Sequence, residues 1–159
     1  FPLGGVGVSG AIKEVMDSVS PDLRWMHGYT CSAHPVGCAV AIANIRILEE
    51  ERLVERSAVL GRRLQEKLGT LDDHPHVGQV RGLGLLAGIE LVADKATGER
   101  YPAGSGIGRR VRDALFARGL LTRVTDETVC LAPPLVVGED DVDRIARIVS
   151  EAIIEVTGR

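Results

Sequence analysis

Apolar residues in the first half of the chain recur with helical spacing in three stretches. Residues 10–19 predict a short amphipathic helix, which Ser20-Pro21-Asp22 ends because proline cannot continue it. Pro35 suits the first position of a second helix. Residues 36–43 behind it are apolar or small on every side, so this helix is predicted to be buried all round. Leucines at positions 53, 60, 64 and 68 continue the spacing up to Gly69, which predicts one long helix.

After residue 76 the pattern changes to that of strands. Short apolar runs at residues 77–83, 85–92, 120–124 and 128–132 are separated by glycine-containing or polar segments. One helical stripe ends at Gly119, and another opens with Glu139-Asp140-Asp141, where the helix dipole favours acidic residues. The positions predicted to be buried in these two stripes are Ile107, Val111, Ala114, Leu115, Val142, Ile145, Val149, Ala152 and Val156. The second half therefore predicts a small α/β domain with a largely antiparallel sheet covered by helices on one face.

The chain is predicted to contain parts of two domains. The long helix is apolar on all sides early and amphipathic later, so we expect it to leave one packed body and cross to another. We place the boundary near Glu50, between residues 1–50 and 51–159. Residues 4–8 are typical of a buried strand, which needs neighbours on both sides. We therefore expect the chain to be a fragment of a longer protein.

Composition narrows the classes of partner. The net charge is −3 with both signs interspersed, which gives no basic surface for nucleic acid or for a membrane. No apolar run is long enough to span a bilayer. The three cysteines lack paired spacing, so they are interpreted as reduced thiols of a cytoplasmic protein, and no metal-binding pattern accompanies them.

The segment His27-Gly28-Tyr29-Thr30-Cys31-Ser32-Ala33-His34-Pro35 is the first candidate site. A hydroxyl-rich loop before a fixed helix start is suited to an anion, because backbone N–H groups and the helix dipole point the same way. The alternative is that Ser32 or His34 simply caps the helix.

Arg123 is the second candidate, at the end of a predicted strand. An arginine on a strand-end loop can bind a carboxylate with two parallel hydrogen bonds. The alternative is a solvated ion pair with Asp126 or Glu127. Arg81 is expected to brace a strand turn. None of the lysines at positions 13, 67 and 95 has the apolar surroundings that Schiff-base chemistry requires.

Residues 1–9, 27–44, 80–97 and 131–135 together resemble the class III (ω-type) pyridoxal-phosphate aminotransferases. The most specific part is the His-Gly-Tyr-Thr-x-Ser-x-His-Pro block at residues 27–35. Within the class the chain is most similar to the pyruvate-using enzymes of ω-amino acids, amines or taurine. The resemblance implies fold type I, in which a small C-terminal α/β domain closes over a large cofactor domain. Residues 1–50 would be the tail of the large domain and the start of the connecting helix, and residues 51–159 the small domain.

The resemblance also implies roles for three residues. Thr30 matches the threonine whose hydroxyl binds the phosphate of pyridoxal 5'-phosphate across a homodimer interface, with the backbone of Tyr29 beside it. Arg123 lies nine residues before Ala132, the spacing of the flexible arginine that binds the substrate carboxylate. The Gly-Asp pair common after that arginine is replaced here by Asp126-Glu127, which implies a more acidic and less flexible loop.

The implied reaction is ping-pong transamination, from an ω-amino acid or amine to a keto acid such as pyruvate. The Schiff-base lysine and the aspartate that pairs with the pyridine nitrogen are expected upstream of Pro2. No catalytic residue is therefore assigned in this chain, and alone it is expected to be inactive. Two alternatives stay open: a non-catalytic binding or assembly module on the same scaffold, and an aminomutase with the same cofactor. The amino donor is not identified by the sequence.

Overall fold

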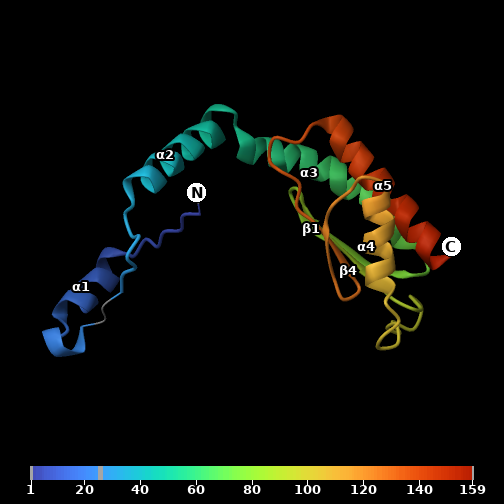
Figure 1. Cartoon of the computed structure of the whole chain (residues 1–159), viewed down its shortest axis with the longest axis horizontal. Helices are drawn as coiled ribbons and strands as arrows, with labels where there is room; N and C mark the ends of the chain where they lie inside the picture. Colours follow the sequence, from blue (N-terminus) through green and yellow to red (C-terminus); the bar gives the residue numbers. More distant parts are fainter. Residues whose placement is uncertain (1, 25–26, 159) are drawn as a thin grey trace. The chain divides into compact units, whose positions relative to one another are not determined.

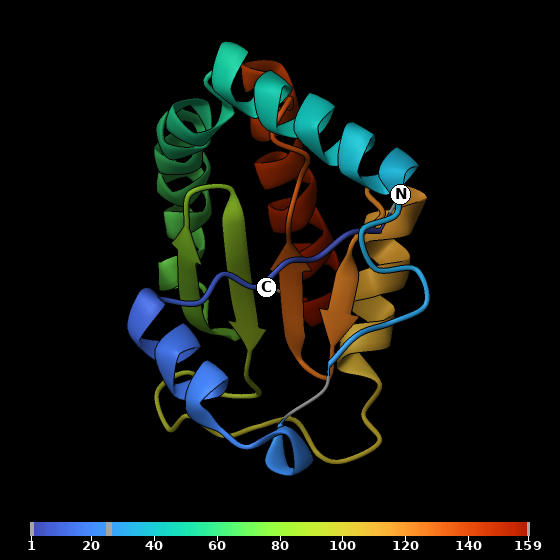
Figure 2. The same cartoon turned by 90° about the vertical axis from the view of Figure 1, so that its left-hand side faces the viewer.

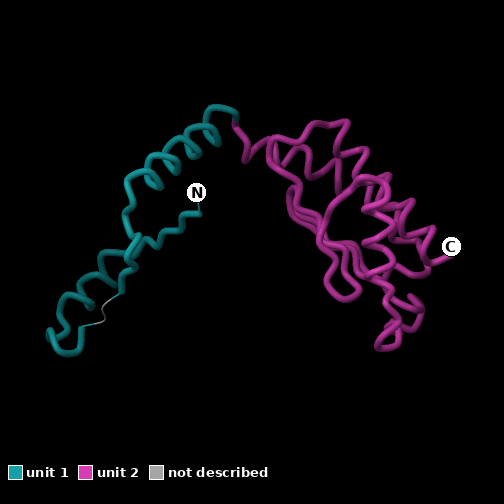
Figure 3. The backbone as a smooth tube through the Cα atoms, in the orientation of Figure 1, with its two compact units in different colours: residues 1–51 teal, residues 52–159 magenta. Residues whose placement is uncertain are grey.

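The computed structural model describes residues 2–24 and 27–158, and the chain divides into two compact units, Phe1–Glu51 and Arg52–Arg159 (Figure 3). The first unit holds the helices α1 (Gly10–Ser18) and α2 (Pro35–Glu50) and a short 3-10 turn (Pro21–Leu23). The second unit holds the helices α3 (Leu53–Gly69), α4 (Ile107–Ala117) and α5 (Glu139–Thr157), a 3-10 turn (Thr70–Asp73) and a sheet (Figure 1).

The helices of the first unit start where the sequence predicts. Ser9 caps α1, because its Oγ accepts a hydrogen bond from the N–H of Ile12 at 3.4 Å. The chain turns at Pro21, as expected from the proline break, and α2 begins at Pro35.

The prediction that α2 is buried on all sides is wrong for the described chain. Gly37 is its only buried residue, whereas the side chains of Val36, Val40 and Ile42 are 57%, 45% and 52% exposed. The apolar side chains of α2 are present as the sequence implies. They could be buried only by another helix or sheet packed over them, and the described residues of this unit do not provide one.

The prediction of one long helix is also wrong. α2 ends at Glu50 and α3 begins at Leu53, with Arg52 between them in the left-handed region at φ 50°. The last turn of α2 carries acidic side chains and no basic one, which opposes the helix dipole. A left-handed residue directly after a helix is a common way for it to end.

The sheet has four antiparallel strands in the order β1-β2-β4-β3. β1 (Val77–Leu83) and β2 (Leu86–Leu91) form a hairpin whose turn contains Gly84 at φ 55°. In β2 the burial alternates, with Ala87 and Ile89 facing the core and Glu90 on the other face. The two strands predicted around Gly82 and Gly84 are thus confirmed.

The second hairpin consists of β3 (Arg123–Thr125) and β4 (Thr128–Leu131), joined by the β3–β4 turn, residues 126 and 127. β3 is shorter than the predicted strand at residues 120–124. The N–H of Leu120 donates to the carbonyl of Leu115 at 3.0 Å, so this segment completes the end of α4 instead of pairing in the sheet.

Three helices cover one face of the sheet. In Figure 2 the strands lie in front of α3 (green), α5 (red) and α4 (orange). The core between the layers contains buried residues from every strand except β3 and from all three helices, among them Leu64, Leu68, Val77, Ile89, Val111, Leu115, Val129, Val142 and Ile153. On α5 the predicted positions Val142, Val149 and Ala152 are buried, and Ile145 and Val156 are partly buried against the core. The predicted mixed α/β fold with a small antiparallel sheet is confirmed.

Candidate functional site

Thr30 lies in a tight turn before α2, and the turn is closed by its neighbours. The N–H of Tyr29 donates to Ser32 Oγ at 3.0 Å, and the N–H of Ser32 donates to the carbonyl of Tyr29 at 2.9 Å. The Thr30 side chain is exposed, and within the described residues its hydroxyl has no hydrogen-bond partner. The Tyr29 amide is engaged in the turn, whereas the Thr30 hydroxyl is open to an external group.

The start of α2 lacks a cap from the side chain of its N-cap residue. Within the described residues, the side chain of His34, which holds the N-cap position, makes no capping hydrogen bond. The alternative that Ser32 caps this helix is wrong, because its hydroxyl belongs to the turn that carries Thr30. An uncapped helix start keeps donors and the positive end of the dipole available to an anion.

Arg123 is exposed and lies at the start of β3, not at the end of a strand as predicted. It pairs across the sheet with Cys130, and its Nε donates to Thr125 Oγ1 at 3.1 Å. In the described part of the chain no carboxylate lies within salt-bridge distance of it. The alternative of an ion pair with Asp126 or Glu127 is therefore not seen, and the guanidinium retains donors for another acceptor.

The acidic residues of the β3–β4 turn face a different neighbour. Asp126 and Glu127 line a cavity of about 330 Å³ together with Arg109 and the glycine-containing loop that precedes α4. Asp126 adopts φ 52°, which is unusual for a residue with a side chain. This contact was not predicted from the sequence, although the run Gly104-Ser105-Gly106-Ile107-Gly108 is typical of a close approach of backbones.

Arg81 braces the strands of the β1–β2 hairpin and not, as the sequence had led us to expect, the turn. It shares a cross-strand row with Gly88, Cys130 and Arg123. Its Nη1 donates to Glu90 Oε2 at 3.1 Å, and Arg100 Nη2 donates to the other oxygen of Glu90 at 3.2 Å. Arg81 is thus tied to a carboxylate, while Arg123 in the same row has no such partner among the residues that the structure describes.

The most perturbed carboxyl lies between two helices. Asp143 on α5 accepts hydrogen bonds from Arg63 Nε at 2.7 Å and Nη2 at 2.8 Å, and Lys67 Nζ lies 3.3 Å away. The bidentate Arg63 contact lowers the pKa of Asp143 to about 2. This network joins α3 to α5 and serves the fold.

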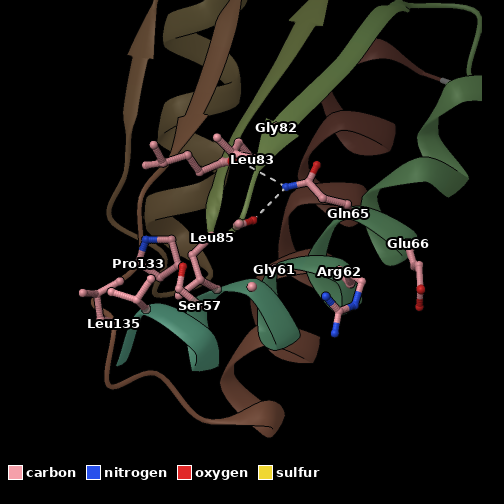
Figure 4. Close-up of a pocket in the computed structure, with 14 residues that line it drawn as sticks. Ser57, Gly61, Arg62, Gln65, Glu66, Gly82, Leu83, Leu85, Pro133 and Leu135 are labelled. Carbon is pink, nitrogen blue, oxygen red and sulfur yellow. Dashed lines mark hydrogen bonds between the residues drawn. The ribbon is translucent and has the colours of Figure 1, made fainter. Parts of the chain in front are cut away.

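A groove of about 810 Å³ lies between α3, the β1–β2 hairpin and the segment 133–135 (Figure 4). Its lining is largely apolar, with Leu83, Leu85, Pro133 and Leu135 among its residues. Gln65 Nε2 spans one side, donating to the carbonyl oxygens of Gly84 at 3.2 Å and Leu86 at 3.1 Å. None of the predicted site residues lines it.

The described residues form neither a metal-binding cluster nor a membrane-spanning helix. Nowhere in residues 2–24 and 27–158 do three or more histidine, cysteine or acidic side chains gather as a metal site would require. Within the same residues, every helix is too short or too polar to cross a membrane.

Comparison with known proteins decides the family. The sequence profile described as Aminotransferase class-III matches residues 1–153. This chain is a class III aminotransferase sequence. The family uses pyridoxal phosphate, and the resemblance inferred from the block at residues 27–35 is confirmed.

Curated relatives within this family are much longer than the chain. The putrescine–pyruvate aminotransferase of Pseudomonas aeruginosa is 40% identical over 146 residues, which are 91% of this chain and 31% of that enzyme. The gamma aminobutyrate transaminase 1, mitochondrial, of Solanum lycopersicum is 36% identical over 160 residues, covering all of this chain and 31% of that protein. The chain thus spans about a third of the length of these relatives.

Solved structures give the same result for the fold. An (S)-enantioselective omega-transaminase from Thermomicrobium roseum superposes with a TM-score of 0.87 at 40% identity, covering 94% of this chain and 33% of that one. The omega transaminase of Pseudomonas jessenii in complex with PMP gives a TM-score of 0.79 at 40% identity, with coverages of 83% and 29%. The fold of this chain is therefore that of part of an omega-transaminase.

Proposed function

We propose that this chain is the C-terminal part of a pyridoxal-phosphate-dependent transaminase. Residues 1–50 would be the end of the large cofactor domain with the start of the connecting helix, and residues 51–159 would be the small domain. The match of residues 1–153 to the class III family carries this proposal. The division of the chain after Glu51 supports the proposed domain limits.

The proposed reaction moves an amino group from an amine or ω-amino acid to a keto acid such as pyruvate. Support comes from the relatives, which include a putrescine–pyruvate aminotransferase and gamma-aminobutyrate transaminases. The cofactor, when bound, supplies an electron sink for proton removal at the carbon that bears the amino group. The residues of this chain would bind and orient the cofactor and the substrate.

Thr30 fits a phosphate-bearing cofactor. Its hydroxyl is exposed and has no partner in the described chain, and the helix start that follows is uncapped. We infer that the hydroxyl donates to a phosphate oxygen, in the site of a second subunit of a homodimer, with Tyr29 beside it. The Tyr29 amide is engaged with Ser32, so Tyr29 would act through its place in the turn rather than through that N–H.

Arg123 fits a carboxylate of the keto acid or amino acid. A guanidinium donates two parallel hydrogen bonds to such a group, and Arg123 has no carboxylate partner in the described chain that would compete. We infer that Arg123 selects the acceptor by this contact and takes no part in proton transfer.

The chain alone is expected to be inactive. Its lysines all have partners or charged surroundings: Lys13 pairs with Asp17, Lys67 with Asp143, and Lys95 donates to the carbonyl of Asp72. None is therefore suited to hold the cofactor. The three cysteines are free thiols, which supports a reducing compartment such as the cytoplasm.

The experiment that tests this proposal uses Arg123→Ala in the full-length enzyme. Single-turnover rates are measured for pyruvate and for an amine that has no carboxylate. We expect the pyruvate half-reaction to lose roughly 30- to 1000-fold, as for other charge pairs left half-made, with the amine half-reaction little changed. Arg112→Ala, at an exposed arginine of α4, is the matched control. Equal losses in both half-reactions would assign Arg123 to the scaffold alone.

A further inference from the structure

The β3–β4 turn rests on the first turn of α4 through a glycine. Gly108 is buried, and a Cβ built on it would lie 1.8 Å from the carbonyl oxygen of Asp126 and 3.2 Å from Val124 Cγ1. No side chain fits at such distances, so any residue larger than glycine forces the turn away from the helix. The contact therefore depends on the absence of a side chain at position 108.

The opposite side of the same turn is tied to the sheet. The carbonyl of Glu127 accepts a hydrogen bond from the N–H of Leu91 at 2.8 Å, and Thr125 pairs with Thr128. Asp126, between these ties and Gly108, is held in the left-handed region. The turn is thus fixed from two sides, and aspartate tolerates the left-handed conformation that a two-residue hairpin turn requires.

This arrangement determines where the acidic turn residues lie relative to Arg123. Asp126 and Glu127 face the cavity beside Arg109. Within the described residues the only side-chain hydrogen bond of Arg123, three residues before Asp126, is the one to Thr125. If the turn moved off Gly108, the two carboxylates would be free to approach Arg123 and compete for it.

We propose that Gly108 is a positioning residue for Arg123. By seating the β3–β4 turn against α4, it keeps the acidic pair away from the guanidinium and fixes the strand from which Arg123 projects. The proposal rests on the carboxylate-binding role proposed above for Arg123. It adds that the selectivity of this site for carboxylate substrates depends on a backbone contact from α4.

The test is Gly108→Ala in the full-length enzyme, with Gly69→Ala as the matched control. A Cβ at Gly69 meets nothing within 4 Å, and its backbone is helical at φ −58°. Hydrogen exchange should become at least about tenfold faster in residues 120–132 of the Gly108 variant and stay unchanged in α5. The KM for pyruvate should rise about tenfold, with the rate of the carboxylate-free amine half-reaction unchanged. The control should behave as the parent enzyme.

Two further variants keep the outcome decisive. Should Gly108→Ala fail to fold, Val124→Ala loosens the same contact without adding atoms. Hydrogen exchange in residues 120–132 and the KM for pyruvate should then rise, but by less than in the Gly108 variant. Unchanged exchange in residues 120–132 would overturn the proposal, and so would faster exchange without a change in KM for pyruvate. Arg123→Ala separates the two hypotheses. If Arg123→Ala impairs the pyruvate half-reaction more than the amine half-reaction and Gly108→Ala does not, only the positioning role of Gly108 fails. If Arg123→Ala impairs both half-reactions equally, the proposed function of Arg123 fails.

Discussion

The contact between α3 and the β1–β2 hairpin offers a stability prediction with an internal control. A Cβ built on Gly61 would lie 2.3–2.4 Å from the backbone atoms of Gly84, where 3.4 Å is ordinary contact. Gly61→Ala must therefore push the hairpin turn away by about 1 Å. The turn carries the carbonyl oxygens to which Gln65 donates at 3.2 and 3.1 Å, so both hydrogen bonds are stretched. The same helix ends at Gly69, where an added Cβ meets nothing.

Three effects set the magnitude of the change in unfolding free energy. Replacing a helical glycine by alanine stabilises by up to about 1 kcal/mol, and this applies to both positions. At Gly61 overpacking costs about 1–3 kcal/mol. Weakening the two Gln65 hydrogen bonds costs about 0.5–1.5 kcal/mol each. We therefore expect a net destabilisation of about 3 kcal/mol for Gly61→Ala, against neutrality or a gain of up to about 1 kcal/mol for Gly69→Ala.

The assay is urea unfolding of the full-length protein, with hydrogen exchange to locate the change. The midpoint should fall for Gly61→Ala, with faster exchange concentrated in residues 77–91 and little change in α5. Gly69→Ala should leave hydrogen exchange as in the parent and the urea midpoint unchanged or slightly raised. A Gly61→Ala protein as stable as the Gly69 variant would refute the argument, because it would mean that the hairpin yields at no cost.

Three other changes test separate parts of the structure. Thr30→Ala in the full-length protein should weaken cofactor retention by a few-fold to about 100-fold, measured by equilibrium dialysis of pyridoxal phosphate, as expected for one charge-assisted hydrogen bond; unchanged affinity would remove Thr30 from the site. Leu64→Ala, at a fully buried position of α3, should lower the unfolding free energy by about 2–5 kcal/mol in urea titration, and a loss below 1 kcal/mol would mean that the core closes around the space. Because the Arg63 contact depresses the folded-state pKa of Asp143 to about 2, its contribution is present above the ordinary value of 3.8 and is lost as pH falls toward 2. Asp143→Asn should therefore flatten the pH dependence of stability between pH 4 and 2, and an unchanged slope would contradict the linkage.

The second unit was largely predictable because its pattern and its packing agree. Alternating residues such as Ala87, Ile89 and Leu91 face the core as the strand spacing requires. The wrong predictions concern segments whose structure depends on local backbone contacts. Leu120 was predicted to begin a strand, but its N–H instead donates to the carbonyl of Leu115 and ends α4. The break at Arg52 depends on backbone geometry that the spacing of apolar residues does not specify.

The candidate site residues could be named from the sequence, but their contacts could not. The residue pattern pointed to Arg123 and to the loop at residues 27–35, and the family resemblance then pointed to Thr30 within that loop. Whether Arg123 pairs with Asp126 or Glu127 depends on where the β3–β4 turn packs. The turn packs against Gly108, which lies on another element, α4. Ser32 could cap either the helix or its own turn, and only the structure distinguishes the two.

The two units also differ in what stabilises them, and this bears on the proposed cofactor contact. The second unit buries an extensive apolar core, so the backbone that carries Arg123 is fixed by the described residues themselves. In the first unit α2 buries only Gly37, and its valines and isoleucines remain exposed. Apolar burial is the main source of folding free energy, so the turn that carries Thr30 is fixed mainly by the hydrogen bonds between Tyr29 and Ser32. An effect of Thr30→Ala on cofactor binding is therefore meaningful only in the full-length protein, where other residues can cover α2, whereas the position of Arg123 is already determined within the unit that contains it.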